Sequence, residues 1–91
     1  MPDIQLPEIL DQRGAQKVAT QLIEQKGKPV TLDASAITRL GGMGVEMLLA
    51  AQRQWQVDGI AFQICNWSPQ AEKAIATLGL STSHFHVEVT A

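Results

Sequence analysis

The chain has 91 residues, a formal net charge of −2 and a single cysteine. This length predicts one small domain over residues 1–91, with a core in 4–80 and a tail or strand in 81–91. The absence of any lysine or arginine run excludes nucleic acid and an anionic membrane surface as partners. One cysteine excludes an internal disulfide, and no apolar run is long enough to span a bilayer, so we expect a soluble cytoplasmic protein.

The first 27 residues predict a short strand followed by a helix. Residues 4–6 alternate in polarity and end at Pro7, which has no amide to donate, so an edge strand is expected. Asp11 is a good N-cap for a helix over residues 12–26, and Gly27 ends it by accepting the left-handed conformation. The expected buried stripe of this helix comprises Ala15, Val18, Ala19, Leu22 and Ile23.

The central stretch predicts a buried strand, a glycine turn and a long helix. Residues 29–33 are rich in β-branched residues, and Gly41, Gly42 and Gly44 follow. Such glycines permit a left-handed backbone or the close approach of another group. The helix starts near residue 43 and closes at Asp58-Gly59. Its expected core face comprises Met43, Met47, Leu48, Ala51 and Trp55, and a second, partly apolar face comprises Val45, Leu49 and Gln52.

The last third predicts a strand, a helix and an alternating tail. Residues 60–65 form the strand, and Ser68 with Pro69 is a strong helix start that Gly79 matches as a stop. The inward residues of this helix are expected to be Ala71, Ala74, Ile75 and Leu78. The tail places Phe85, Val87 and Val89 on one side, as a last strand or as an arm lying on the domain.

Strands that alternate with helices predict an α/β fold with a mostly parallel sheet and right-handed crossovers. With so few strands, we expect all helices to sit on one face and leave the other partly open. No internal repeat and no low-complexity linker interrupts this order.

The run LDASAITRLGGMGVEMLLAAQRQWQVDG, the later Ser68-Pro69 and the ending ATLGL resemble the STAS domain, the family of sulfate transporter tails and anti-sigma factor antagonists. The resemblance extends from about Leu6 to Leu80, and it is nearest to short STAS proteins found beside bacterial chemotaxis genes. It implies a small domain of about four strands and three helices, with the first family strand short or missing.

One departure from the family pattern concerns regulation. In phosphoregulated members this turn reads aspartate, serine or threonine, a small residue, then glycine. Aligning Gly44 with the family glycine puts Gly41 at the aspartate and Gly42 at the phosphorylated hydroxyl. Glycine cannot accept a phosphate, so the charge switch is lost at this position. Ser35 and Thr38 are the nearest hydroxyls, and Ser35 is expected to bond local backbone instead.

Three uses of the glycine turn remain open: a tight backbone connection, a contact surface for a partner, and an anion or nucleotide site at the helix N-terminus. The spacing GGMG matches neither phosphate-binding motif, which weakens the last. His84, His86 and Glu88 resemble metal ligands, but on a chain end they are expected to form a solvated edge, so no metal is predicted. Cys65 is expected to be an inert core thiol.

Two tryptophans are expected to differ in role. Trp55 is predicted to anchor the central helix in the core. Trp67 precedes the cap of the last helix and is predicted to be partly exposed, as aromatics in interfaces are.

No nucleophile with a base, no carboxylate pair and no cofactor motif stands out, so we expect a non-enzyme without a cofactor. The hypothesis is a regulatory adaptor that binds a kinase-like or chemotaxis signalling protein, as the resemblance implies. Its contact residues are predicted to be Arg39, Gly41, Gly42, Met43, Val45, Glu46, Leu49 and Gln52. The alternatives are a STAS subunit of a lipid-transport ABC complex and a small anion binder. The oligomeric state, including a homo-oligomer, is left open.

Overall fold

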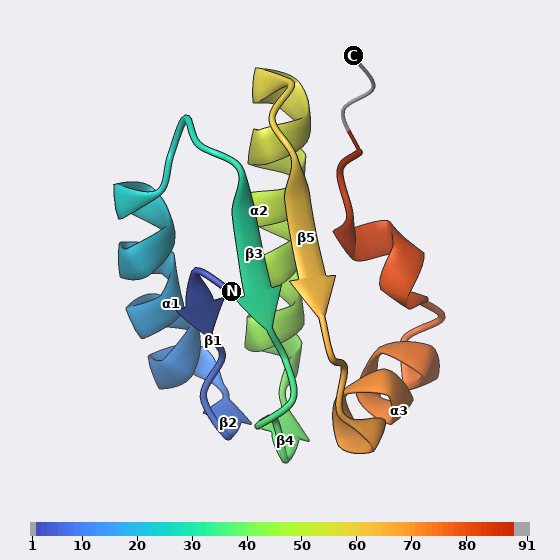
Figure 1. Ribbon diagram of the computed structural model, residues 1–91. Coiled ribbons are helices and arrows are strands. Elements are labelled where there is room, and N and C mark those ends of the chain that lie inside the picture. The colour runs from blue at the N-terminus through green and yellow to red at the C-terminus, as the bar shows by residue number, and fades with distance from the viewer. Residues whose placement is uncertain (1, 89–91) are drawn as a thin grey trace.

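A computed structural model describes residues 2–88 of the chain (Figure 1). Strands and helices alternate along most of it, as the residue pattern predicts. In chain order the elements are β1 (Ile4–Gln5), β2 (Ile9–Leu10), α1 (Gln12–Glu24), β3 (Val30–Asp33), β4 (Arg39–Leu40), α2 (Gly42–Asp58), β5 (Phe62–Cys65), α3 (Pro69–Thr77) and the 3-10 helix η1 (Thr82–Phe85). The predicted α/β class, with three α-helices and a mostly parallel sheet, is confirmed.

The main sheet has three parallel strands in the order β1-β3-β5. Leu32 pairs with Ile4 on one side and with Ile64 on the other, and all three side chains are buried. The alternating residues Gln5 and Gln63 are exposed on the opposite face. Helices α1 and α2 lie side by side on one face, while α3 and η1 lie beyond the β5 edge (Figure 1). The short edge strand expected over residues 4–6 is therefore present as β1.

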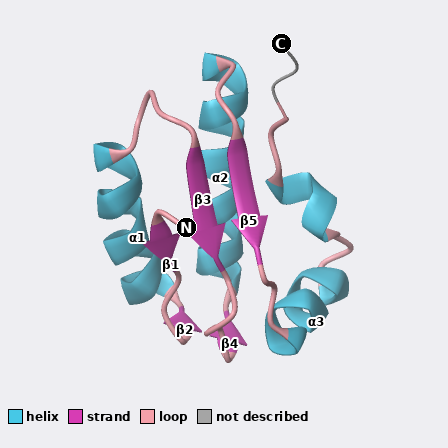
Figure 2. Cartoon of the chain, viewed as in Figure 1, coloured by secondary structure: helices cyan, strands magenta, loops and turns pink. Residues whose placement is uncertain are grey.

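A second, two-stranded ladder leads the chain into both long helices. Strands β2 and β4 pair in parallel, and the Gly41 amide donates to the Leu10 carbonyl oxygen at 3.1 Å. Figure 2 shows these two short strands together below the main sheet. Because α1 begins two residues after β2 and α2 begins two residues after β4, the two helices start side by side and run in parallel. The residue pattern did not predict this ladder.

The N-caps predicted at Asp11 and Ser68 are confirmed, whereas α1 ends at Glu24 with Gln25 as its C-cap, before the predicted stop at Gly27. The Asp11 carboxylate accepts a hydrogen bond from the Gly14 amide at 3.0 Å, and the Ser68 hydroxyl accepts one from the Ala71 amide at 3.1 Å. The same hydroxyl donates to the Ile37 carbonyl oxygen at 2.6 Å, which ties the start of α3 to the loop after β3. Gly59 ends α2 with a φ of 69°, a conformation that other residues rarely adopt.

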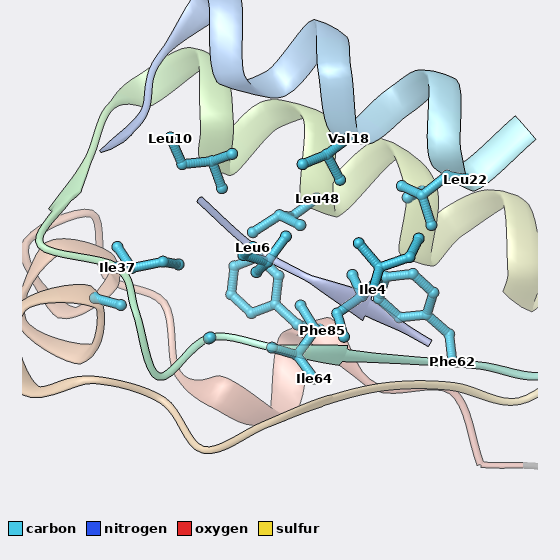
Figure 3. Close-up of a cluster of buried hydrophobic side chains, with 14 of the residues drawn as sticks. Ile4, Leu6, Leu10, Val18, Leu22, Ile37, Leu48, Phe62, Ile64 and Phe85 are labelled. Carbon is cyan, nitrogen blue, oxygen red and sulfur yellow. The ribbon is translucent and has the colours of Figure 1, made fainter. Parts of the chain in front are cut away.

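The core lies between the sheet and the helices (Figure 3). Phe62 and Phe85 are its largest fully buried side chains. Trp55 anchors α2 as predicted, since its indole N–H donates to the Lys28 carbonyl oxygen at 2.8 Å and its ring lies 5.7 Å from that of Phe62. Phe85 shows that the buried core continues past residue 80.

Three residues expected in the core lie outside it. Ile23 is 73% exposed, Leu78 is 56% exposed and Met43 is 51% exposed. On α1 the buried stripe is narrow, and Ile23 is turned about 100° from Leu22 around the helix axis. Leu78 lies after the last residue of α3, and Met43 is in the first turn of α2. These three predictions were wrong. Ala19 and Ala74 are only half-buried, and Met47 is half-buried but packs against the core as predicted.

The tail meets the sheet as an arm, not as a full strand. Phe62 and Val87 exchange two backbone hydrogen bonds, of 3.1 and 2.8 Å, in a single antiparallel bridge. The expected fourth strand is thus reduced to one residue pair within the described part of the chain. Val89, which was expected on the same side as Phe85, lies outside the described residues.

Candidate protein-interaction site

The glycine turn uses ordinary backbone conformations. Gly41 caps α2 with φ −89° and ψ 169°, which any residue adopts. Among the described residues, the glycines with positive φ are Gly27, Gly59 and Gly79, so none of the three turn glycines needs a left-handed conformation. Of the two structural uses predicted for them, only close approach remains.

Gly44 is required by such an approach. A Cβ atom there would collide with the Leu10 carbonyl oxygen, and it would lie 2.9 Å from Leu10 Cγ and 3.1 Å from Leu40 Cδ1. The start of α2 therefore packs directly on the β2–β4 ladder. Gly42 differs, because a Cβ atom at that position would meet nothing within 4 Å. The fold gives no reason for a glycine at position 42.

A shallow groove of about 360 Å³ runs between the first halves of α1 and α2. Ala15 and Ala19 form one apolar wall, and Met43 and Met47 form the other. Because the alanines are short, the two helices leave a depression where longer side chains would fill the space. The polar residues of the lining are Gln12, Gln16 and Glu46.

Half of the predicted contact residues are exposed at the turn or in the groove. Arg39, Gly42, Met43 and Glu46 are exposed, and Gly41 is half-buried. Met43 and Glu46 line the groove itself. The turn and the groove together form one surface, which we call the turn–groove surface: Arg39, Gly41, Gly42, Met43 and Glu46 with Gln12, Ala15, Gln16, Ala19 and Met47.

Three predicted contact residues are buried or hydrogen-bonded within the domain. Val45 is 3% exposed and belongs to the core, so its place in the predicted surface is corrected. Its side chain points toward the sheet, as do those of Leu48 and Ala51. Leu49 is half-buried against the core, and the Gln52 amide donates to the His86 carbonyl oxygen of the arm at 3.1 Å.

Residue pattern alone did not identify the α1 wall of the groove. Ala15 and Ala19 were assigned to the buried stripe, and Gln12 and Gln16 carried no motif. The available signal was the small size of the alanines on the helix face that contacts α2. That signal acquires meaning only when the neighbouring helix is known.

The two residues that carry the alternative hydroxyls, Ser35 and Thr38, are both held by hydrogen bonds. Ser35 is exposed, and its amide donates to the Asp33 carboxylate at 2.8 Å, while the Thr38 hydroxyl donates to the Glu8 carbonyl oxygen at 3.2 Å. Hydrogen bonds from Ser35 hold the pKa of Asp33 below its usual range. Ser35 was expected to bond local backbone; instead its own backbone amide bonds the Asp33 side chain at the end of β3.

The remaining singled-out residues lie far from the turn in sequence. Cys65 is half-buried at the end of β5, and Trp67 is half-buried with its ring 5.2 Å from that of Phe85. His84 lies in η1, where its Nδ1 is 3.0 Å from the Ser81 amide that donates to it. Across residues 2–88 no group of three histidine, cysteine or acidic side chains is arranged to hold a metal ion.

Electrostatics at the start of α2 disfavour an anion. The Cα atom of Asp11 would lie 3.9 Å from a Cβ atom at Gly41, and the Asp11 carboxylate caps the neighbouring helix α1. The hydrogen bond from the Gly14 amide lowers the pKa of Asp11, which keeps the group ionised near neutral pH. A negative charge at this place opposes the pull of the free helix amides on a second anion.

Comparisons with known proteins agree with the fold. The family model described as "Mlab, STAS domain" matches residues 2–88. No curated protein and no solved structure matches the chain. None of the helices within residues 2–88 combines the length and the apolar character that a membrane span requires. The chain belongs to the STAS family, whose domains generally act in regulation and protein–protein interaction without catalysis.

Proposed function

We propose that this STAS domain is a non-catalytic adaptor of bacterial signalling that binds another protein through the turn–groove surface. The observation that carries the proposal is Gly42. It is exposed, it occupies the first position of α2, and no neighbouring atom requires the absence of its side chain. Glycine is a poor residue for a helix, because it loses the most backbone entropy on folding. The close approach of a partner to the backbone at Gly42 explains why a glycine stands there, since the fold itself does not require one.

The chemistry of the surrounding surface supports the same proposal. Exposed Met43 and half-buried Met47 give flexible apolar side chains, which adapt well to a partner. Arg39 and Glu46 place one charge of each sign beside them. Such a surface, apolar in the centre and polar at the rim, is typical of protein interfaces.

The proposed partner is a kinase-like or chemotaxis signalling protein, as the family resemblance implies. Because Gly42 stands where phosphoregulated members carry a hydroxyl, phosphorylation at this position does not control binding here. Control of the complex then depends on the concentration of the partner or on another surface of the domain.

A second candidate is a STAS subunit that sits on the ATPase of a lipid-transport ABC complex. The description of the matched family model names Mlab and no chemotaxis protein, so it gives no support to the chemotaxis role of the first candidate. The same turn–groove surface is proposed to contact the ATPase. An anion binder at the turn is a weaker alternative because of the nearby Asp11 carboxylate.

The test is a pull-down from native lysate with wild type and Gly42→Glu. The added side chain has open space in the fold and touches no core residue, so the variant is expected to stay folded. Gln21→Glu is the matched control, since Gln21 is exposed on the side of α1 opposite Ala19.

We expect one protein to be captured by wild type and by Gln21→Glu and to be lost with Gly42→Glu. Its identity by mass spectrometry separates a signalling protein from an ATPase. Equal capture by all three proteins would show that the turn–groove surface is not the interface.

A further inference from the structure

The outer face of α2 carries a row of exposed residues. Met43, Glu46, Ala50, Arg53 and Val57 are all exposed, and Val57 reaches 78%. At 3.6 residues per turn these five positions fall within an arc of about 80° around the helix axis. They form a single straight stripe, which we call the α2 stripe.

The α2 stripe is symmetric about Ala50. Met43 lies seven residues before Ala50 and Val57 lies seven residues after it, which places both at about 10.5 Å along the axis. Glu46 lies about 6 Å before Ala50 and Arg53 lies about 4.5 Å after it. The apolar ends are therefore alike, while the charges on the two sides are opposite.

This order is self-complementary under a two-fold axis. A rotation about an axis perpendicular to α2 at Ala50 brings a second α2 against the first in the antiparallel sense. Met43 of one copy then meets Val57 of the other. Glu46 and Arg53 lie on the same flank of the stripe, about 20° apart. The rotation brings this flank of one copy beside the same flank of the other copy. Each Glu46 therefore meets an Arg53 of the other copy, and the pair occurs twice.

We propose that the α2 stripe docks on the same stripe of a second copy of this chain, forming a two-fold symmetric dimer. Ala50 at the axis is small enough for the two helices to approach closely. The layer of α1 adds to the contact, because Ile23 is 73% exposed and lies one turn after Ala19 on the same face of α1. A specific interface needs roughly 1,200 Å² of buried surface. The α2 helix is about 25 Å long, so α1 and α2 together supply more of that area than α2 alone.

The dimer does not depend on the proposed adaptor function, but the two share Met43 and Glu46. A second copy on the α2 stripe covers one wall of the groove. Dimer and adaptor complex therefore exclude each other, and the dimer is a resting form from which a partner must release the monomer.

Charge reversal tests the proposal in the full chain. Sedimentation equilibrium is measured for wild type, Glu46→Arg, Arg53→Glu and the double variant that carries both changes. We expect wild type to dimerise, each single variant to raise the dimer Kd at least about tenfold because two pairs become repulsive, and the double variant to recover the wild-type Kd. Glu72→Arg, an exposed reversal on α3, is the control and leaves the Kd unchanged.

A wild-type chain that stays monomeric up to about 1 mM would overturn the proposal. So would a double variant as weak as the single variants, because any pairing would then involve other charges. Far-ultraviolet circular dichroism confirms that each variant is folded. A wild-type chain that is monomeric but loses partner capture with Gly42→Glu would refute this inference alone, whereas an intact wild-type dimer with capture insensitive to Gly42→Glu would refute the adaptor surface alone.

Discussion

Gly42 and Gly44 stand two residues apart in one turn, yet they are glycines for different reasons. Gly44 is buried, and its missing side chain lets α2 rest on the backbone of Leu10. Gly42 is exposed with open space around it. The run of glycines therefore combines one packing requirement with one position that the fold does not constrain.

Alanine substitutions separate the two cases. Gly44→Ala is expected to lower the free energy of unfolding by about 1–3 kcal/mol, because the new Cβ atom overlaps the Leu10 carbonyl oxygen and the neighbouring backbone must shift. Gly42→Ala is expected to raise it by about 0.4–1 kcal/mol through the lower entropy of the unfolded chain. Urea denaturation of both variants beside wild type measures these changes. Equal effects at the two positions would contradict this explanation.

At the scale of an element, the width of a buried stripe decides which apolar residues enter the core. On α1 the buried residues include Val18 and Leu22, whereas Ile23 is turned to the solvent. On α2 the core face is Gly44, Val45, Leu48, Ala51 and Trp55. Periodicity located both helices correctly but made each stripe too wide, because it assigned Ile23 and Met43 inward on apolar character alone.

The adjacent residues Leu22 and Ile23 provide a matched comparison on one helix. Leu22→Ala removes a side chain that is 4% exposed, so we expect a loss of about 2–5 kcal/mol from transfer and cavity terms. Ile23→Ala is expected to stay within about 0.5 kcal/mol of wild type when both are measured at concentrations low enough to keep the chain monomeric. Thermal unfolding followed by circular dichroism distinguishes the two. A large loss at Ile23 would mean that its side chain is covered in solution, and the dimer interface is then the first place to look.

At the scale of the whole molecule, the arm after α3 completes the core. Phe85 is fully buried, its ring lies 5.2 Å from that of Trp67, and Val87 pairs with Phe62 at the edge of β5. The Gln52 side chain also bonds the arm, which joins the C-terminal segment to α2. The arm is thus part of the domain and not an appendage.

Phe85→Ala is expected to cost about 3–5 kcal/mol, because the removed ring leaves a cavity between the helices and the sheet. Domains of this kind have total stabilities of about 5–15 kcal/mol, so the variant should show a much lower urea midpoint or no folded baseline. Phe85→Leu retains most of the apolar volume and is expected to lose less. A variant Phe85→Ala with wild-type stability would show that the arm does not contribute to the core.

The sequence by itself determined the order of the three main-sheet strands and the three α-helices, the caps at Asp11 and Ser68, and the family. These features depend on contacts between residues a few positions apart, on local backbone preference or on a direct residue match. Tertiary structure alone decided the β2–β4 ladder, the burial of Val45, the groove between α1 and α2 and the place of Phe85. Each of these requires two segments distant in sequence to meet, and periodicity along one segment carries no information about the surface of its neighbour.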